Sequence, residues 1–436
     1  MAANRPKGTR DFLPETMAAR QKVIQTVRDT FELFGFGELQ TPAFERIETL
    51  TGKYGDETDK LMFKIIKRGR GAENGECDMA LRYDLTVPLA RVMAMNTDIR
   101  TPFKRYQIQP VWRAERAQRG RFREFYQCDV DIVGATGALA EAECLAVMYQ
   151  CFVALGLPLV NLHINDRRIL SDLAALAGAE DENAELKVLI AIDKLDKVGR
   201  SGVTEELVRR GFEQTKIDLL FNAIERPEQG DDILKALSTH LTERGQEGIA
   251  SIRALVKATV AMGVPAERLV LDPTLARGAD YYTGPVFEAQ MPALGIGSLG
   301  GGGRYDTLIG RFSKQDLPTV GVSIGLERVL VILEEQGLLP AIGPTAKVLV
   351  TLFSENETET AINTASALRS AGIATDLYLE PKKLKAQFKY AHARGYPFLV
   401  VIGPDEAANN SATLRNLKTG EQTTLLVTEL ANLINQ

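Results

Sequence analysis

Histidine and cysteine are scarce in this sequence, which has three histidines and four cysteines among its 436 residues. The cysteines, Cys77, Cys128, Cys144 and Cys151, form no Cys-x-x-Cys pair. A zinc site built from histidine and cysteine is therefore not expected. Four cysteines in a chain of this length do not form a disulfide scaffold either, and they fit the reducing environment of the cytoplasm.

Long apolar segments are also missing. The N-terminal stretch MAANRPKGTRDFLPETMAAR has no apolar core of the signal-peptide type, and no run approaches the ~20 apolar residues of a membrane span. Positive charge is not in excess, since 52 Lys and Arg face 57 Asp and Glu for a net charge of −5. We expect a cytoplasmic protein without a membrane segment. Its overall charge argues against coating nucleic acid but leaves room for a local basic patch.

The chain is long enough for two to three domains, because an average domain has roughly 150 residues. β-rich segments at 1–179 and 263–336 flank a stretch, 180–262, that is helical throughout. We predict one α+β domain interrupted by a helical insertion. A segment with proline and glycine at 340–344 marks a linker. Strands and helices alternate over 345–436, which predicts a separate α/β domain with a parallel sheet.

Two aromatic and β-branched runs, FKRYQIQPVWRAE and FREFYQCDVDIVG, predict a β-hairpin with the polar loop RAQRGR. Pro110 lies within the first run, so we expect an edge position or a kink there. Five arginines gather around the loop: Arg113, Arg116, Arg119, Arg121 and Arg123. A solvated turn would explain them, but their aromatic neighbours favour binding of phosphate and a stacked base.

Polar residues alternate along the second strand of this hairpin. Gln127, Asp129 and Asp131 share one face, because residues i and i+2 of a strand point the same way. That face is either half exposed or the floor of a polar pocket, and taken alone the spacing favours exposure. Asp84 and Thr86, in LRYDLTVP, repeat the same spacing.

The segment GIGSLG, Gly295 to Gly300, matches the dinucleotide-binding pattern G-x-G-x-x-G. That pattern needs a helix that begins at its last glycine, yet three more glycines follow, and a glycine run does not begin a helix. A Walker lysine is missing as well. We therefore expect no NAD site. The segment is either a flexible loop or backbone that passes close beneath a ligand, and its β-rich surroundings favour the second interpretation.

Each of two charged features has two possible roles. Glu327 and Arg328 begin an otherwise apolar predicted helix, where an interface ion pair and a functional role are equally favoured. The segment PKKLKAQFKYAHARG is basic and contains no acid; its charges are Lys382, Lys383, Lys385, Lys389 and Arg394. It is either a solvated helix face or a surface for an RNA backbone.

Taken in order, five motifs resemble the class II aminoacyl-tRNA synthetases and, within that class, the histidyl-tRNA synthetase family. They are LRYDLTVP, FKRYQIQPVWRAERAQRGRFREFYQCDVDIVG, ARGADYYTGPVFEA, GGGGRYD and GVSIGLERV. The resemblance covers essentially the whole chain, and its RG-DYYTG-VFE element is highly specific. It implies a six-stranded antiparallel catalytic sheet with flanking helices, an inserted helical domain and a C-terminal anticodon-binding domain. It also implies a homodimer formed through the region around Pro42.

The activity that this resemblance implies is a ligase reaction in two steps. Histidine and ATP form histidyl-adenylate and pyrophosphate, and the histidyl group then passes to the 3′ end of tRNA(His). ATP is thus a substrate, Mg²⁺ is expected to accompany it, and no metal is expected to be held by protein ligands alone.

The resemblance also implies roles for individual residues. For ATP they are Arg113 at the α-phosphate, Glu115 and Phe125 at adenine, and Arg328 on the γ-phosphate side. For histidine they are Asp84, Thr86 and Gln127 at the α-amino end, and Asp131 and Tyr282 near the imidazole with Tyr281 beside them. Arg277 is expected to approach both the substrate carboxylate and the α-phosphate. Arg121 and Arg123 lie in the loop expected to face ATP and the tRNA acceptor end. Since successive strand residues face opposite ways, we expect one of the two tyrosines to line the histidine pocket and the other to pack behind it.

Two alternatives share parts of this resemblance. A non-catalytic regulatory subunit of ATP phosphoribosyltransferase would lack the RG-DYYTG element and the anticodon-binding domain. A pseudo-synthetase that binds RNA or acts in kinase signalling would have lost Arg113, Arg277 or Arg328. All these features are present in this sequence, so both alternatives are disfavoured.

Overall fold

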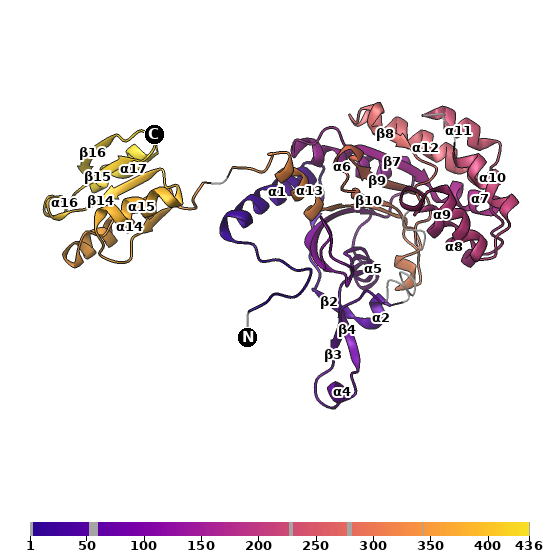
Figure 1. The fold of residues 1–436 in the computed structure, drawn as a ribbon, viewed down its shortest axis with the longest axis horizontal. Coiled ribbons are helices and arrows are strands. Elements are labelled where there is room, and N and C mark those ends of the chain that lie inside the picture. Colours follow the sequence, from indigo (N-terminus) through magenta and orange to yellow (C-terminus); the bar gives the residue numbers. More distant parts are fainter. Residues whose placement is uncertain (1–2, 52–59, 226–229, 277–280, 342, 436) are drawn as a thin grey trace. The chain divides into compact units, whose positions relative to one another are not determined.

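The computed structural model of the chain describes residues 3–51, 60–225, 230–276, 281–341 and 343–435. The described residues fall into two units (Figure 1), the first within Met1–Phe12 and Arg20–Leu339 and the second within Leu13–Ala19 and Pro340–Gln436. In these described ranges, no helix combines the length and the apolarity that crossing a membrane requires.

A large sheet forms the centre of the first unit (Figure 1). Its strand order is β1-β5-β6-β11-β10-β9-β7-β8. The strands are β1 (Gly37–Glu38), β5 (Phe103–Trp112), β6 (Glu124–Val133), β7 (Asn161–Asp166), β8 (Leu269–Leu271), β9 (Pro285–Gln290), β10 (Ser298–Arg304) and β11 (Thr319–Gly325). The six strands from β5 to β7 pair antiparallel, which confirms the expected sheet. Short parallel strands, β1 and β8, extend it at the two edges.

The predicted hairpin is confirmed as β5 and β6, paired from Phe103 opposite Val133 to Trp112 opposite Glu124. On its other side β5 pairs with β1 only at Arg105 and Tyr106. Pro110 therefore lies beyond the end of β1, at the edge position that its missing N–H favours.

Strand β6 separates an apolar layer from a polar one. Cys128, Val130 and Ile132 are buried in the main hydrophobic core. Helix α6 (Ala138–Ala154) packs on this side, where the Cys144 thiol lies 3.8 Å from the Val320 carbonyl oxygen. Alternation along the strand turns the intervening polar side chains to the opposite face of the sheet.

The remaining helices of the first unit complete this core. Helix α1 (Pro14–Leu33) contributes Val23, Ile24, Val27 and Phe31 to it, and α13 (Leu326–Glu335) follows β11. A group of helices gathers at the β7–β8 end of the sheet (Figure 1): α7 (Arg167–Leu176), α8 (Glu182–Ile192), α9 (Leu195–Arg209), α10 (Gln214–Ile224), α11 (Asp231–Ser238) and α12 (Glu243–Ala261). They share the main core with the sheet, and the division at 180 and 262 stays a prediction.

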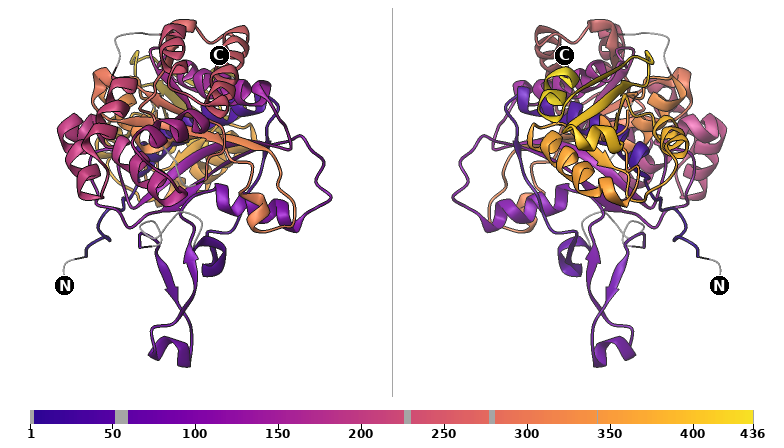
Figure 2. Two further views of the ribbon diagram at one scale, coloured as in Figure 1. Left: turned by 90° about the vertical axis from the view of Figure 1, so that its right-hand side faces the viewer. Right: turned by 90° about the vertical axis from the view of Figure 1, so that its left-hand side faces the viewer.

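A three-stranded sheet projects from the first unit (Figures 1 and 2). Its order is β2-β4-β3, with β2 (Phe44–Arg46), β3 (Lys64–Ile66) and β4 (Cys77–Leu81). The short helices α2 (Ile47–Leu50) and α4 (Arg70–Glu73) accompany it, and α5 (Thr86–Met95) follows β4. Three 3₁₀ turns connect other elements of this unit: η1 (Ala266–Arg268), η2 (Pro292–Leu294) and η3 (Ile309–Arg311).

The second unit is an α/β domain with its own core. Its sheet order is β13-β12-β14-β15-β16, built from β12 (Val348–Val350), β13 (Thr375–Leu377), β14 (Phe398–Val401), β15 (Ser411–Asn416) and β16 (Gln422–Leu426). Strands β13, β12 and β14 are parallel as predicted, whereas β15 and β16 add an antiparallel edge. Its other elements are η4 (Glu355–Glu357), α14 (Thr358–Ser370), α15 (Leu384–Arg394), α16 (Pro404–Ala408), η5 (Val427–Glu429) and α17 (Leu430–Ile434).

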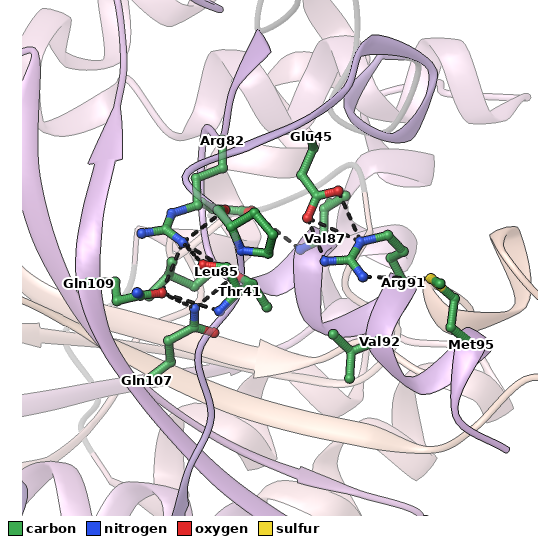
Figure 3. A network of polar contacts seen from close by, with 12 residues as sticks. Thr41, Glu45, Arg82, Leu85, Val87, Arg91, Val92, Met95, Gln107 and Gln109 are labelled. Carbon is green, nitrogen blue, oxygen red and sulfur yellow. Dashed lines mark hydrogen bonds and ion pairs between the residues drawn. The ribbon is translucent and has the colours of Figure 1, made fainter. Parts of the chain in front are cut away.

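A buried arginine, Arg82, ties the segment around Pro42 to the large sheet (Figure 3). Its side chain donates to the carbonyl oxygens of Thr41 at 2.7 Å, Pro42 at 3.1 Å and Pro110 at 3.0 Å. It also donates to Gln109 Oε1 at 2.9 Å. Burial lowers the pKa of Arg82 to about 10, so the guanidinium remains charged at neutral pH.

The Arg82→Ala variant is expected to lower the free energy of unfolding by roughly 3 kcal/mol or more, because each buried acceptor left without a donor costs about 1–3 kcal/mol. Urea denaturation measures this loss. Arg46→Ala is the matched control, since the Arg46 side chain is 79% exposed and its ion pair with Glu48 lies at the surface. Equal denaturation midpoints for the two variants would contradict a stabilising role for Arg82.

Candidate active site

A cavity of about 780 Å³ opens on the polar face of the large sheet. Residues from motifs far apart in the sequence line it together. The predicted site residues among its described walls are Asp84, Thr86, Arg113, Glu115, Arg121, Phe125, Gln127, Asp131, Tyr281, Tyr282 and Arg328. The fold therefore gathers most of the predicted positions around one space.

The floor of the cavity includes the polar face of β6. Gln127, Asp129 and Asp131 all line the cavity and are 8%, 2% and 3% exposed. The interpretation that the spacing alone favoured, a half-exposed strand, is wrong, because α6 covers one face of β6 and the walls of the cavity enclose the other. Gln127 donates to Ser323 Oγ at 2.8 Å, which fixes its amide on the adjacent strand.

Asp131 is held by two partners. Arg105 lies directly opposite it on β5 and forms a fully buried ion pair, with Nη2 at 2.6 Å from Asp131 Oδ2. The Tyr305 hydroxyl donates to Asp131 Oδ1. Gly321 lies opposite Asp131 on β11, and a Cβ there would overlap the carboxylate. Burial raises the pKa of Asp131, and the Arg105 guanidinium opposes this rise.

Asp129 is the second buried carboxyl group of the floor. Burial raises its pKa to about 7, against the opposing effect of the Arg105 guanidinium, and the neighbouring Asp131 adds to the rise. With a pKa near neutrality, a charged group that binds next to Asp129 can shift the balance between its protonated and ionised forms.

Asp84 precedes helix α5, whose first residue is Thr86. Its Oδ1 accepts hydrogen bonds from the backbone N–H groups of Thr86 and Val87, both at 3.1 Å. A carboxylate at a helix N-terminus satisfies orphan N–H groups and complements the helix dipole. Asp84 thus positions the start of α5 and also lines the cavity.

The two tyrosines face the same cavity. Tyr281 and Tyr282 precede β9 instead of lying within a strand, and both line the cavity. Their ring centroids are 4.5 Å apart, and the Tyr281 hydroxyl donates to the Tyr282 hydroxyl at 3.2 Å. The expectation that they point to opposite faces is wrong, because the alternation of side chains holds only in extended strands. Arg277 lies outside the described residues.

Arg113 is fixed between two aromatic rings. Its guanidinium carbon lies 4.3 Å from the Tyr83 ring centroid and 5.1 Å from that of Phe125. Its Nε donates to the Tyr83 carbonyl oxygen at 3.1 Å, and Nη2 donates to Gln127 Oε1 at 3.4 Å. These contacts hold a cation in place at the cavity wall, which suits recognition of a phosphate.

The other arginines of the hairpin have different surroundings. Arg121 lines the cavity and forms an ion pair with Glu115. Arg123 donates its Nε–H to the Glu115 carbonyl oxygen at 3.1 Å. Arg119 pairs with Glu335 at the surface, and Arg116 is exposed. The cluster therefore divides between cavity and surface, although its members are close in sequence.

For Glu327 and Arg328 the sequence left an ion pair and a functional role equally favoured, and their contacts show that each residue has one of these two roles. Glu327 forms a buried ion pair with Arg20, while Arg328 lines the cavity and donates to the Ser298 carbonyl oxygen. Gly120 of the hairpin loop packs beside Arg328, where an added Cβ would lie 3.0 Å from Arg328 Cγ.

The glycine run is a strand, so the flexible-loop interpretation is wrong. Gly300, Gly301 and Gly302 belong to β10 and line the cavity. Because Gly300 lies inside a strand, the segment does not have the helix that the dinucleotide pattern requires. A Cβ on Gly302 would overlap the Gly321 carbonyl oxygen, so this position needs glycine for close packing of β10 against β11.

Several wall residues were not predicted. Tyr305 contacts the Asp131 carboxylate, and Asp193, Asp196 and Lys197 reach the cavity from the helical group. The fully buried Arg105, which pairs with Asp131, was not predicted either. The spacing of Arg105, Gln107 and Gln109 repeats the i, i+2 pattern recognised on β6, so it could have indicated the polar face of β5. The sequence carries no comparable signal for the approach of the helices.

Comparisons with known proteins agree with this arrangement. A family model described as histidyl-tRNA synthetase matches residues 8–329, and one described as anticodon binding domain matches residues 347–436. The histidine–tRNA ligase of Christiangramia forsetii is 42% identical over 442 residues, which cover 96% of each chain. That of Phocaeicola vulgatus is 41% identical over 446 residues, covering 98% of this chain and 97% of the other.

The fold agrees over the same length. A crystal structure of histidyl-tRNA synthetase from Nostoc sp. superposes with a TM-score of 0.81 at 30% identity and covers 100% of this chain and 99% of the other. The resemblance found in the sequence is thereby confirmed in sequence and fold together, and the chain belongs to the histidyl-tRNA synthetase family of class II aminoacyl-tRNA synthetases.

Proposed function

We propose that the chain is a histidine–tRNA ligase. It activates histidine with ATP and then transfers the histidyl group to the 3′ end of tRNA(His). The observation that carries the proposal is that the walls of one cavity combine two oriented arginines, Arg113 and Arg328, with the buried carboxyl group of Asp131. Family membership over both units supports the same activity.

The ATP side of the proposed site uses the hairpin and α13. Arg113 binds the α-phosphate, and its place between two aromatic rings keeps the guanidinium oriented. Phe125 stacks on adenine, Glu115 contacts the base edge, and Arg328 binds on the γ-phosphate side. Hydrogen bonds to backbone carbonyl oxygens, of Tyr83 for Arg113 and of Ser298 for Arg328, orient both guanidinium groups, so little reorganisation accompanies the build-up of charge.

The histidine side uses the floor of the cavity and the two tyrosines. Asp84, Thr86 and Gln127 hold the α-amino end, and Asp131 and Tyr282 bind the imidazole with Tyr281 beside them. A buried carboxylate paired with Arg105 can accept a hydrogen bond from an imidazole N–H. The pocket therefore selects an amino acid that offers such a donor.

The two steps then follow from charge. A histidine carboxylate oxygen attacks the α-phosphorus, the bond to the β-phosphate oxygen breaks, and pyrophosphate leaves. The arginines, including Arg277, bring positive charge to a centre where two anions meet, which lowers the energy of the transition state more than that of the separated reactants. A terminal hydroxyl of the tRNA next attacks the histidyl carbonyl carbon, and AMP leaves. Arg121 and Arg123 are candidates to contact the acceptor end.

Mg²⁺ is expected to arrive with ATP. It prefers phosphate and water oxygens with one or two carboxylates, and Glu288 on the cavity wall offers such a ligand. Among the described residues no group of three or more His, Cys, Asp or Glu could hold a metal ion without ATP.

A homodimer through the region around Pro42 is proposed on its exposed apolar side chains. Phe44 and Ile66, on the projecting sheet, are 49% and 58% exposed, and Met95 at the end of α5 is 71% exposed. Exposed apolar side chains on a projecting element suit an interface with a second copy of the chain. We place the protein in the cytoplasm, where tRNA is charged for translation.

The activity is tested by histidine-dependent exchange between ATP and radiolabelled pyrophosphate, followed by charging of tRNA(His). Exchange that depends on histidine and on none of the other amino acids is expected. A folded chain that catalyses no exchange at saturating histidine and Mg²⁺–ATP would overturn the proposal and favour the regulatory-subunit alternative.

Deleting residues 345–436 is expected to weaken tRNA charging much more than adenylate formation. The second unit has its own core, and Lys383, Lys385, Lys389 and Arg394 are exposed on or beside α15, which suits contact with an RNA backbone. Charging and exchange are measured on the same preparation. If a folded truncation loses charging and pyrophosphate exchange equally, the proposed anticodon role is contradicted.

A further inference from the structure

Three segments meet at one carboxylate, that of Glu327. The side chain of Glu327 is 4% exposed and accepts two hydrogen bonds from Arg20, at 2.9 and 2.6 Å. The Tyr126 backbone N–H, on β6, donates to Oε1 at 3.2 Å. Arg10, from the N-terminal segment, forms a second ion pair with Oε2. One buried anion thus joins α1, the hairpin and the N-terminal segment to the start of α13.

The N-terminal segment 8–12, here called the N-terminal arm, also contacts the hairpin directly. The Arg123 backbone N–H donates to the Gly8 carbonyl oxygen at 2.8 Å. Gly8 has a φ of +85°, and a Cβ there would lie 2.8 Å from Arg123 Cγ. Both the backbone conformation and the space therefore require glycine at this position. The Arg10 guanidinium carbon lies 3.5 Å from the Phe122 ring centroid.

The two ends of this contact both belong to the cavity. Phe122 and Glu327 line it, and Glu327 precedes Arg328, which the proposed function places on the γ-phosphate side. The only covalent path from the hairpin loop to α13 runs through about two hundred residues, as the separation of 201 between Tyr126 and Glu327 shows. Two direct contacts already join the hairpin to α13, the hydrogen bond from the Tyr126 N–H to Glu327 and the surface ion pair of Arg119 with Glu335. Arg10 adds a bridge through the N-terminal arm, because one guanidinium contacts Phe122 by its face and Glu327 by ion pairing.

The two arginines on Glu327 differ in exposure. The Arg20 side chain is 2% exposed and neutralises a carboxylate that would otherwise be buried unpaired. The Arg10 side chain is 25% exposed, and the fold already satisfies Glu327 without it. Loss of Arg10 therefore removes the bridge without leaving a buried charge, whereas loss of Arg20 or Glu327 would do so.

We propose that the N-terminal arm is a clasp that fixes the hairpin loop against α13, and that Arg10 is a positioning residue for the ATP half of adenylation. The inference rests on the proposed function for its effect on the reaction and on geometry alone for its effect on the hairpin. Arg10 acts through Phe122 and Glu327; it sets where the hairpin loop and Arg328 stand when ATP binds.

The test compares Arg10→Ala, Arg10→Lys and the control Arg5→Ala. Arg5 lies three residues before the arm, with its side chain 60% exposed and 3.9 Å from Asp11. Arg10→Ala is expected to lower kcat/KM for ATP by about 10- to 100-fold, the range that a misplacement of about 1 Å costs. The KM for histidine and the melting temperature stay close to those of the unaltered chain. Arg10→Lys recovers only part of the loss, because an ammonium keeps the charge but not the planar stacking on Phe122.

A second measurement keeps the clasp testable apart from the enzymatic proposal. Hydrogen–deuterium exchange of the full chain without substrates is expected to be faster at residues 116–123 in Arg10→Ala than in Arg5→Ala. Equal exchange in these two variants would overturn the clasp, even if histidine activation is confirmed. Equal losses for ATP and histidine together with a lower melting temperature would overturn it as well, since they would make Arg10 a general structural residue. If the unaltered chain has no histidine-dependent activity, the proposed function is overturned. The hydrogen–deuterium exchange of residues 116–123 then still decides whether the N-terminal arm acts as a clasp.

Discussion

The Asp131→Ala variant is expected to lower kcat/KM for histidine by about 10⁴-fold, because sites built around hydrogen bonds discriminate on that scale when a bond is missing. The KM for ATP should change little, since the Asp131 side chain contacts Arg105 and Tyr305 on the floor and the proposed ATP contacts come from other residues. Pyrophosphate exchange at varied histidine and at varied ATP separates the two effects.

The fold adds a complication to this experiment. Removing Asp131 alone leaves Arg105 buried and unpaired, which costs about 3–5 kcal/mol of stability. The double variant Arg105→Met with Asp131→Leu removes both charges and should restore most of that stability. Weak histidine use with a normal melting temperature in the double variant would establish recognition by Asp131. If ATP use falls as far as histidine use, Asp131 is structural and the pocket assignment fails.

For Arg277→Ala, a decrease in the adenylation rate of ~10²–10³-fold is expected, equivalent to ~3–4 kcal/mol, as for the loss of one preorganised donor at a reacting centre. Thr274 and Leu275 before it, and Tyr281 and Tyr282 after it, line the cavity. If Arg277 acts mainly in the transition state, substrate binding should weaken less than the rate. Arg277→Lys should recover only part of the rate, because one ammonium does not bridge a carboxylate and a phosphate as a guanidinium does.

Single-turnover kinetics and melting curves decide the role of Arg277. Arg253→Ala serves as the control, since this arginine forms a half-exposed surface ion pair with Asp231. A normal adenylation rate in stably folded Arg277→Ala would refute the catalytic role. A fall in melting temperature that damages both reaction steps together would show instead that Arg277 forms a structural ion pair.

Local patterns in the sequence were enough to predict much of the architecture. The helix α1, the hairpin of β5 and β6 and the parallel part of the second sheet all follow from periodicity and from turn residues, which act within a few positions of each other. Family motifs extended this to a set of site residues, most of which line the cavity. The sequence did not predict β1, which has two residues and pairs with β5 far along the chain, or the antiparallel pair of β15 and β16 at the edge of the second sheet.

Each error at the site has a physical cause. An i, i+2 pattern states which side chains share a face but not what covers that face, so the spacing of Gln127, Asp129 and Asp131 favoured exposure where the structure has a cavity floor. The same rule misled at Tyr281 and Tyr282, since it applies only where the backbone is extended. The glycine run was ambiguous because glycine permits both loops and the closest strand packing.

The sequence by itself determined which residues are placed next to one another along each element, and through its motifs the family. Only the tertiary structure decided the partners that set the chemistry. The hydrogen bond from Tyr305 to Asp131 spans 174 positions, and the ion pair of Arg20 with Glu327 spans 307. Such pairs leave no periodic trace in the chain, because their geometry depends on how the sheet, helices and N-terminal arm pack. Their effect is large for the same reason, since burial removes the water that would otherwise screen each charge.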